Sequence, residues 1–224
     1  MDTLHMIDLT MIQKIAIWAI PVIFAITLHE LAHGWVASWF GDQTARLSGR
    51  LSINPLKHID PIGTVLLPLL MLMVSNFIFG WAKPVPVDAR NLHHPRRDMA
   101  FVALAGPFAN LLMALGWGVI AKLGMVLLNS GNEVIGIPLS YMGSAGIMIN
   151  VVLGVLNLIP LPPLDGGKVL VSILPRRLAY YVSRLEPYGI VILLVLLMLG
   201  WLGEWLALPV FAVINGIAKL FGLA

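Results

Sequence analysis

The chain has 224 residues, of which 59% are hydrophobic and only 11% are charged, with a formal net charge of +3. A soluble domain carries roughly 25% charged residues, so this composition excludes an ordinary soluble globular fold and indicates an integral membrane protein. The absence of cysteine excludes a disulfide framework, a thiol nucleophile and thiolate metal ligands.

Apolar segments close to the ~20 residues that cross a bilayer core recur along the chain. They lie at 11–28, 62–80, 99–121, 140–161 and 189–208, with a weaker one at 207–222. We therefore expect an all-α polytopic membrane protein with about five to six membrane segments. No linker or repeat divides the chain, so residues 1–224 are predicted to form a single domain. Its core would cover about 11–170, and further membrane segments would follow at about 187–222.

The first predicted helix covers residues 11–40 and ends at Gly41-Asp42. The loop that follows, 41–61, is basic, and the other basic residues also lie in short loops between apolar segments. Such residues are typical of orientation signals rather than of a nucleic-acid surface, and they place this loop in the cytoplasm. The first helix would then run from the outside to the inside.

Within this helix, the stretch Thr27–Gly34 places two imidazoles and a carboxylate in an apolar run. His29 and His33 are four residues apart, so both rings can reach one metal ion; the alternative is a pair of core histidines. Glu30 points about 100° away in the helical projection and could act as general base on a metal-activated water. Ionisable groups inside a membrane are usually functional. The pair would lie within the bilayer, nearer the cytoplasmic side.

The segment 62–80 is apolar enough to span, yet the loops before and after it are equally basic. A re-entrant hairpin that turns near Pro68 or Ser75-Asn76 keeps both loops inside, and we favour it over a full crossing. The stretch Trp81–Asp88 has the alternation and prolines of an extended edge segment, which could pair with an unwound peptide.

The third segment begins after Asp98 and contains Gly106-Pro107-Phe108-Ala109-Asn110. We interpret Gly106 and Asn110 as a small-residue contact between helices rather than as part of a catalytic site. His58, His93 and His94 lie in basic loops, where we expect solvated or interfacial side chains.

The fourth segment breaks at Asn157, because three prolines within 160–163 forbid a regular helix. Asp165 follows and is the natural third metal ligand, since a catalytic zinc commonly has three protein ligands and one open position. It could instead be only a turn residue of Leu-Asp-Gly-Gly. Asn157 is a candidate donor to a developing oxyanion or to the substrate backbone, or it caps the broken helix.

Together, His29-Glu30-x-x-His33, Gly106-Pro107-x-x-Asn110 and the stretch from Asn157 to Asp165 resemble the site-2 protease family of intramembrane zinc metalloproteases. The resemblance covers about residues 20–170 and is to the compact bacterial and archaeal branch without PDZ and CBS domains. It implies one Zn²⁺ bound at His29, His33 and Asp165, with Glu30 as the catalytic base and Asn157 near the scissile bond.

We therefore expect an intramembrane zinc endopeptidase of a prokaryotic inner membrane. Its partners would be the lipid bilayer and membrane-protein substrates with a transmembrane helix, with no nucleic acid, and its oligomeric state is left open. Two alternatives use the same residues, namely a metal-ion transporter with these ligands as a transit site and a non-catalytic module that binds membrane helices. Transporters usually show repeated halves, and no repeat is evident in this chain. A module that only binds helices does not require a general base such as Glu30.

Overall fold

The computed structural model describes residues 10–66 and 83–223. All regular structure in these two ranges is helical, which confirms the expected all-α class. In chain order the α-helices are α1 (Met11–Trp39), α2 (Thr44–Leu47), α4 (Pro95–Asn129), α5 (Glu133–Asn157), α6 (Asp165–Ile173), α7 (Arg176–Ser183), α8 (Glu186–Met198) and α9 (Trp201–Phe221). Short helical turns occupy η2 (Pro55–His58), η3 (Pro61–Leu66) and η4 (Ala89–Asn91).

Four of the described helices are long and apolar enough to cross a membrane, namely Ile15–Trp39 of α1, α4, α5 and α9. The pair α7 and α8, bent by 63°, would make a fifth if it forms one broken span. The polytopic membrane class is thereby confirmed. Most of segment 62–80 falls in 67–82, outside the described residues, so the hairpin stays a prediction.

Helix α1 has the bounds that the sequence predicts to within one residue. At its start, Oγ1 of Thr10 accepts the Gln13 N–H at 3.3 Å and Gln13 Oε1 accepts the Thr10 N–H at 2.9 Å, a reciprocal cap that satisfies two free donors. At its end, Gly41 has a φ of +107°, a conformation that favours glycine and stops the helix.

The carboxylate of Asp42 ties this end of α1 to the chain before α4. It is fully buried and accepts the backbone N–H of Thr44 and of Asp88, at 3.0 and 2.7 Å. Burial alone would raise the pKa of Asp42, but the hydrogen bonds from Thr44, Asp88 and Asn91 outweigh it and lower that pKa below its usual value.

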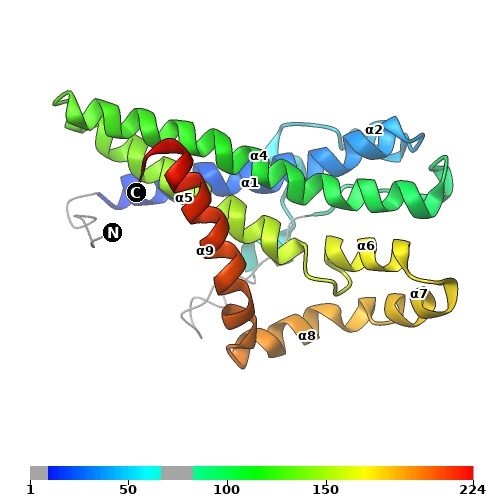
Figure 1. Cartoon of the computed structure of the whole chain (residues 1–224). Helices are drawn as coiled ribbons and strands as arrows, with labels where there is room; N and C mark the ends of the chain where they lie inside the picture. The colour runs from blue at the N-terminus through cyan, green and yellow to red at the C-terminus, as the bar shows by residue number, and fades with distance from the viewer. Residues whose placement is uncertain (1–9, 67–82, 224) are drawn as a thin grey trace.

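Helices α1, α4 and α5 lie side by side and form the centre of the fold (Figure 1). Glycines allow close packing of α4 on α5: a Cβ on Gly143 would lie 2.4 Å from the Ala121 nitrogen, and one on Gly124 would lie 2.4 Å from the Ser140 nitrogen. In these contacts residue numbers rise along α4 as they fall along α5, so the two helices are antiparallel. Helices α1 and α4 are antiparallel for the same reason, since His33 contacts Val102 and Ala25 contacts Asn110. Helices α1 and α5 therefore run in the same direction.

The C-terminal segments differ from the prediction. Residues 189–208 do not form one helix, because α8 ends at Met198 and Gly200 takes a left-handed φ of +78° before α9 begins. The weak segment 207–222 covers most of α9, which is itself a candidate span. With 13 residues α8 is only about 20 Å long, too short to cross a bilayer core alone.

The described part of the expected edge segment, residues 83–88, is non-helical, as expected, and Arg50 holds it through 2.8 and 3.2 Å hydrogen bonds to the carbonyls of Lys83 and Pro84. Its pairing with an unwound peptide stays a prediction. The loop prediction for His58 is wrong. His58 is buried rather than solvated, because its ring turns back toward its own loop and Nε2 lies 2.9 Å from the Ser52 carbonyl oxygen.

Candidate metal centre

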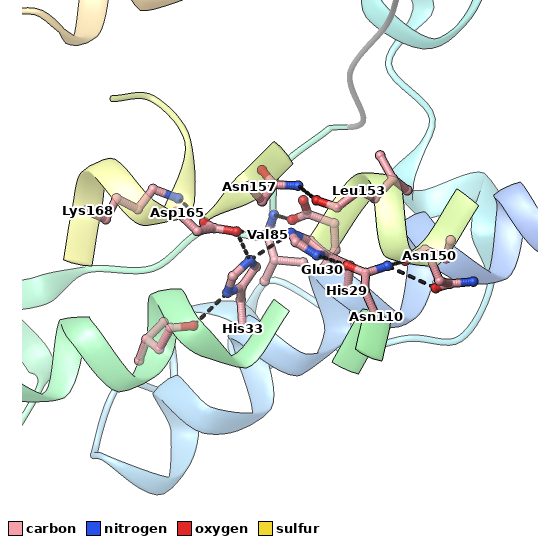
Figure 2. A network of polar contacts seen from close by, with 12 residues as sticks. His29, Glu30, His33, Val85, Asn110, Asn150, Leu153, Asn157, Asp165 and Lys168 are labelled. Carbon is pink, nitrogen blue, oxygen red and sulfur yellow. Dashed lines mark hydrogen bonds and ion pairs between the residues drawn. The ribbon is translucent and has the colours of Figure 1, made fainter. Parts of the chain in front are cut away.

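The structure brings His29 and His33 of α1 together with Asp165, the first residue of α6 (Figure 2). All three side chains are buried, with residue exposures of 8%, 7% and 3%. The two histidines lie one turn apart on the same face of α1, as their spacing predicts. Asp165 reaches them from more than a hundred residues further along the chain.

A tight turn after α5 delivers Asp165 to this place. Helix α5 ends at Asn157, and the prolines at 160–163 prevent its continuation. The chain then folds back so closely that a Cβ on Gly166 would lie 2.2 Å from the Leu158 carbonyl oxygen and one on Gly167 would lie 2.2 Å from the Pro162 nitrogen. Only glycine fits at these two positions, which explains why the pair follows Asp165.

Three electron-rich atoms meet at the centre of this cluster. The Nε2 atoms of His29 and His33 are 3.1 Å apart, and each lies 3.2 Å from Oδ2 of Asp165. The other ring nitrogens have acceptor partners, since His29 Nδ1 lies 2.6 Å from Asn110 Oδ1 and His33 Nδ1 lies 2.7 Å from the Val102 carbonyl oxygen. Each Nδ1 therefore carries the hydrogen, and in the neutral ring Nε2 presents its lone pair.

Lone pairs and a carboxylate oxygen at this separation repel one another unless a positive charge lies among them. Burial opposes a charged Asp165, but the ammonium group of Lys168, 3.1 Å from Oδ1, favours the charged form. Asp165 is thus a carboxylate, and its buried Oδ2 has no hydrogen-bond partner. A cation bound among these three atoms would offset their repulsion.

Zinc fits this set of donors. It binds imidazole nitrogen and carboxylate oxygen at about 2.0–2.2 Å in tetrahedral geometry, so its ligand atoms lie roughly 3.3 Å apart. The three distances of 3.1 and 3.2 Å are close to that edge length. Three protein ligands leave one position open, which is the pattern of a catalytic rather than a structural zinc.

Gly106 and Asn110 of α4 lie at this centre, so the interpretation as a simple contact between helices missed their main surroundings. A Cβ on Gly106 would lie 2.5 Å from both His29 Cε1 and His33 Nε2, so the absence of a side chain makes room for the rings. Asn110 is fully buried and holds His29. The signal was available, because an amide four residues from a glycine in an apolar helix shares its face and needs a buried partner.

Glu30 and Lys168 complete the surroundings. Glu30 is half-buried, and its Oε2 accepts the backbone N–H of Val85 at 2.7 Å, which fixes the carboxylate. Lys168, one turn into α6, lies 3.1 Å from Oδ1 of Asp165. Oδ1 thus faces the ammonium group, and Oδ2 faces the histidines. The contact of Lys168 with Asp165 was not predicted from the sequence.

Asn157 is half-buried at the last position of α5. Its amide donates to the Leu153 carbonyl oxygen of its own helix at 3.0 Å (Figure 2). A role for Asn157 toward a substrate therefore stays a prediction.

Comparisons with known proteins point to zinc metalloproteases. The family model for peptidase family M50 matches residues 17–200. The curated protein named "Putative zinc metalloprotease YwhC" of Bacillus subtilis is 39% identical over 207 residues, which cover 90% of this chain and 89% of that protein. "Putative zinc metalloprotease Rip2" of Mycolicibacterium smegmatis is 28% identical over 183 residues, 82% of this chain and 67% of that protein. No solved structure matches the chain.

A more distant relative has a similar name. "Zinc metalloprotease MJ0392" of Methanocaldococcus jannaschii is 24% identical over 180 residues, which cover 79% of this chain and 41% of that protein.

The first prediction concerns metal content. We expect about one zinc per detergent-purified chain, and a nearly complete loss in His29→Ala and in Asp165→Ala, because two ligands do not retain a catalytic zinc. Elemental analysis of gently purified protein measures this. His94→Ala is the matched control, since the His94 side chain is 66% exposed and should leave the metal in place. Zinc that persists in Asp165→Ala would contradict the three-ligand site.

The second prediction tests the space at Gly106. We expect Gly106→Ala to lower zinc affinity at least about tenfold, because the new methyl group displaces the imidazole rings, and ligand-orienting changes are worth that much. Chelator competition measures the affinity. Gly116→Ala in the same helix is the control, since a Cβ there meets nothing within 4 Å. Equal affinities of the two variants would show that the rings have room to spare.

Proposed function

The chain belongs to peptidase family M50, the site-2 proteases, and on this premise we propose that it cleaves peptide bonds within membrane-spanning segments of other membrane proteins. It is a zinc metalloprotease by family and by the names of its relatives. The observation that carries the proposal is the position of the His29, His33 and Asp165 donors, which are buried among helices apolar enough to cross a membrane. A site in such surroundings is suited to substrates that are themselves in the bilayer.

In the proposed mechanism, His29, His33 and Asp165 hold the zinc. When bound, the zinc supplies a Lewis acid that polarises a carbonyl group and makes water a nucleophile near neutral pH. Glu30 takes a proton from the attacking water and passes it to the leaving amine. The N–H of Val85 occupies Glu30 Oε2, so that the carboxylate is held in one orientation and Oε1 is left to accept the proton.

Asn157 is proposed to contact the substrate backbone. One hydrogen of its amide nitrogen is used by the Leu153 carbonyl oxygen, and the second can be donated. A substrate helix must first unwind, because its peptide carbonyls are otherwise hydrogen-bonded within the helix. A side-chain donor near the site would stabilise the opened carbonyl or the negative charge that develops on it.

We propose that the protein lies in a prokaryotic inner membrane with the site nearer the cytoplasm. The end of α1, the start of α4 and the end of α5 lie at the same end of the helix group, since α4 is antiparallel to the other two. The basic loops 41–61 and 83–98 and the basic stretch 168–184 all join this end, which the positive-inside rule assigns to the cytoplasm. His33 lies six residues, about 9 Å, before the end of α1.

The third prediction separates metal binding from turnover. Glu30→Gln should retain zinc, because Glu30 is not among the ligand atoms, and should lower the cleavage rate at least about 100-fold, because an amide cannot accept the proton. The assay is cleavage of a membrane-spanning substrate in proteoliposomes by zinc-loaded protein.

Glu133→Gln, at the far end of α5, is the matched control and should cleave at the unaltered rate. Undiminished cleavage by Glu30→Gln would refute the proposed role of the base. Zinc uptake into the same proteoliposomes, without cleavage, would favour a transporter instead.

A further inference from the structure

Two asparagines lie fully buried between the central helices, Asn110 in α4 and Asn150 in α5. An amide in an apolar interior destabilises the fold unless its hydrogen-bonding groups have partners. Both amides have partners, and these partners form one continuous line of contacts that ends at His29 (Figure 2).

The orientation of the line can be worked out from its far end. The Asn150 amide lies 2.9 Å from the Gly146 carbonyl oxygen, one turn earlier in α5. A backbone carbonyl only accepts, so the Asn150 atom that faces it is the nitrogen. The Asn150 side-chain oxygen must then face the other way, and it lies 3.0 Å from the amide nitrogen of Asn110.

The same reasoning fixes Asn110. Its nitrogen donates one hydrogen to Asn150 Oδ1 and the other toward the Ala25 carbonyl oxygen of α1, a longer contact of 3.4 Å. Both donors are used, so Oδ1 of Asn110 accepts from His29 Nδ1 at 2.6 Å. His29 therefore carries its hydrogen on Nδ1 and turns the lone pair of Nε2 toward His33 and Asp165.

The two histidines differ in what holds them. His33 Nδ1 donates to the backbone carbonyl of Val102, an acceptor that no side-chain change can reverse. The orientation of His29 instead depends on an amide, which could present either its oxygen or its nitrogen. Asn150 makes the second arrangement unfavourable, because that arrangement would set the Asn110 oxygen against the Asn150 oxygen; the Ala25 carbonyl oxygen opposes it from the longer distance of 3.4 Å.

We propose that Asn150 is a positioning residue of the metal centre, which acts through Asn110 to fix the tautomer and ring orientation of His29. This inference rests on the proposed role of His29 as a zinc ligand. Within the described residues, the side-chain hydrogen bonds of Asn150 go to Asn110 and to the Gly146 carbonyl oxygen and not to the ligand atoms, so it reaches the centre through the Asn110 side chain. Outer partners of this kind typically contribute 10- to 100-fold to metal affinity.

The fourth prediction uses zinc affinity, measured by chelator competition without substrate, in a set of variants. Asn110→Ala should weaken zinc binding about 10- to 100-fold, because His29 loses its acceptor. Asn150→Leu should weaken it by less, about three- to tenfold, because the Ala25 carbonyl oxygen still holds Asn110. In the cobalt-substituted protein, the visible bands of tetrahedral coordination should lose intensity in both variants.

Asn150→Asp is the conservative variant that separates orientation from packing. Its carboxyl group presents an oxygen to Asn110 in either protonation state, so zinc should bind no more weakly than in the unaltered chain. Val151→Ala, at the adjacent buried position of α5, controls for a loss of packing and should leave zinc affinity unchanged.

The double variant Asn110→Ala with Asn150→Leu decides whether Asn150 acts through Asn110. If it does, the double variant binds zinc as Asn110→Ala does, within about twofold; independent effects would multiply. Multiplied effects, or unchanged affinity in Asn150→Leu, overturn the proposal.

If zinc affinity responds to Asn150→Leu but the chain cleaves no membrane protein, the proposed function alone fails. If the chain cleaves and Asn150→Leu binds zinc normally, this inference alone fails.

Discussion

The close contact of α1 with α4 at Gly106 is the constraint on which the metal centre depends. Two imidazoles project from α1 toward a neighbouring helix, and they fit only because Gly106 has no side chain where a Cβ would lie 2.5 Å from both rings. The same approach brings the Val102 carbonyl and the Asn110 amide to the Nδ1 atoms. One glycine thus provides both the space for the rings and the partners that orient them.

The centre combines strongly polar groups with surroundings that cannot solvate them. Inside an apolar helix group, no water is available as a hydrogen-bond partner, so each unpaired polar group destabilises the fold. The Nδ1 atoms of His29 and His33 and the amides of Asn110 and Asn150 have hydrogen-bond partners. The ligand atoms converge instead on one another, and Asp165 Oδ2 has no hydrogen-bond partner. A bound cation satisfies these atoms together, which couples the stability of the centre to its metal.

Two stretches of irregular backbone hold residues of the centre in place. The turn between α5 and α6 delivers Asp165, and the non-helical segment 83–88 supplies the Val85 N–H that holds Glu30. Regular helices satisfy their own backbone groups and offer none to a ligand or a substrate. The two irregular stretches place Asp165 and Glu30 at the end of the helix group where the basic loops lie.

The sequence by itself determined the membrane class, the bounds of α1 to within one residue, the break at Asn157 and the shared face of His29 and His33, because these follow from composition, a four-residue spacing and the conformational limits of proline. It did not determine the break at Gly200, where local hydropathy is continuous and a left-handed glycine ends the helix. Only the tertiary structure placed Gly106 and Asn110 at the histidines and joined Asn150 to them. These contacts link three helices through residues 40 and 81 positions apart, and no local pattern records which faces of separate helices meet.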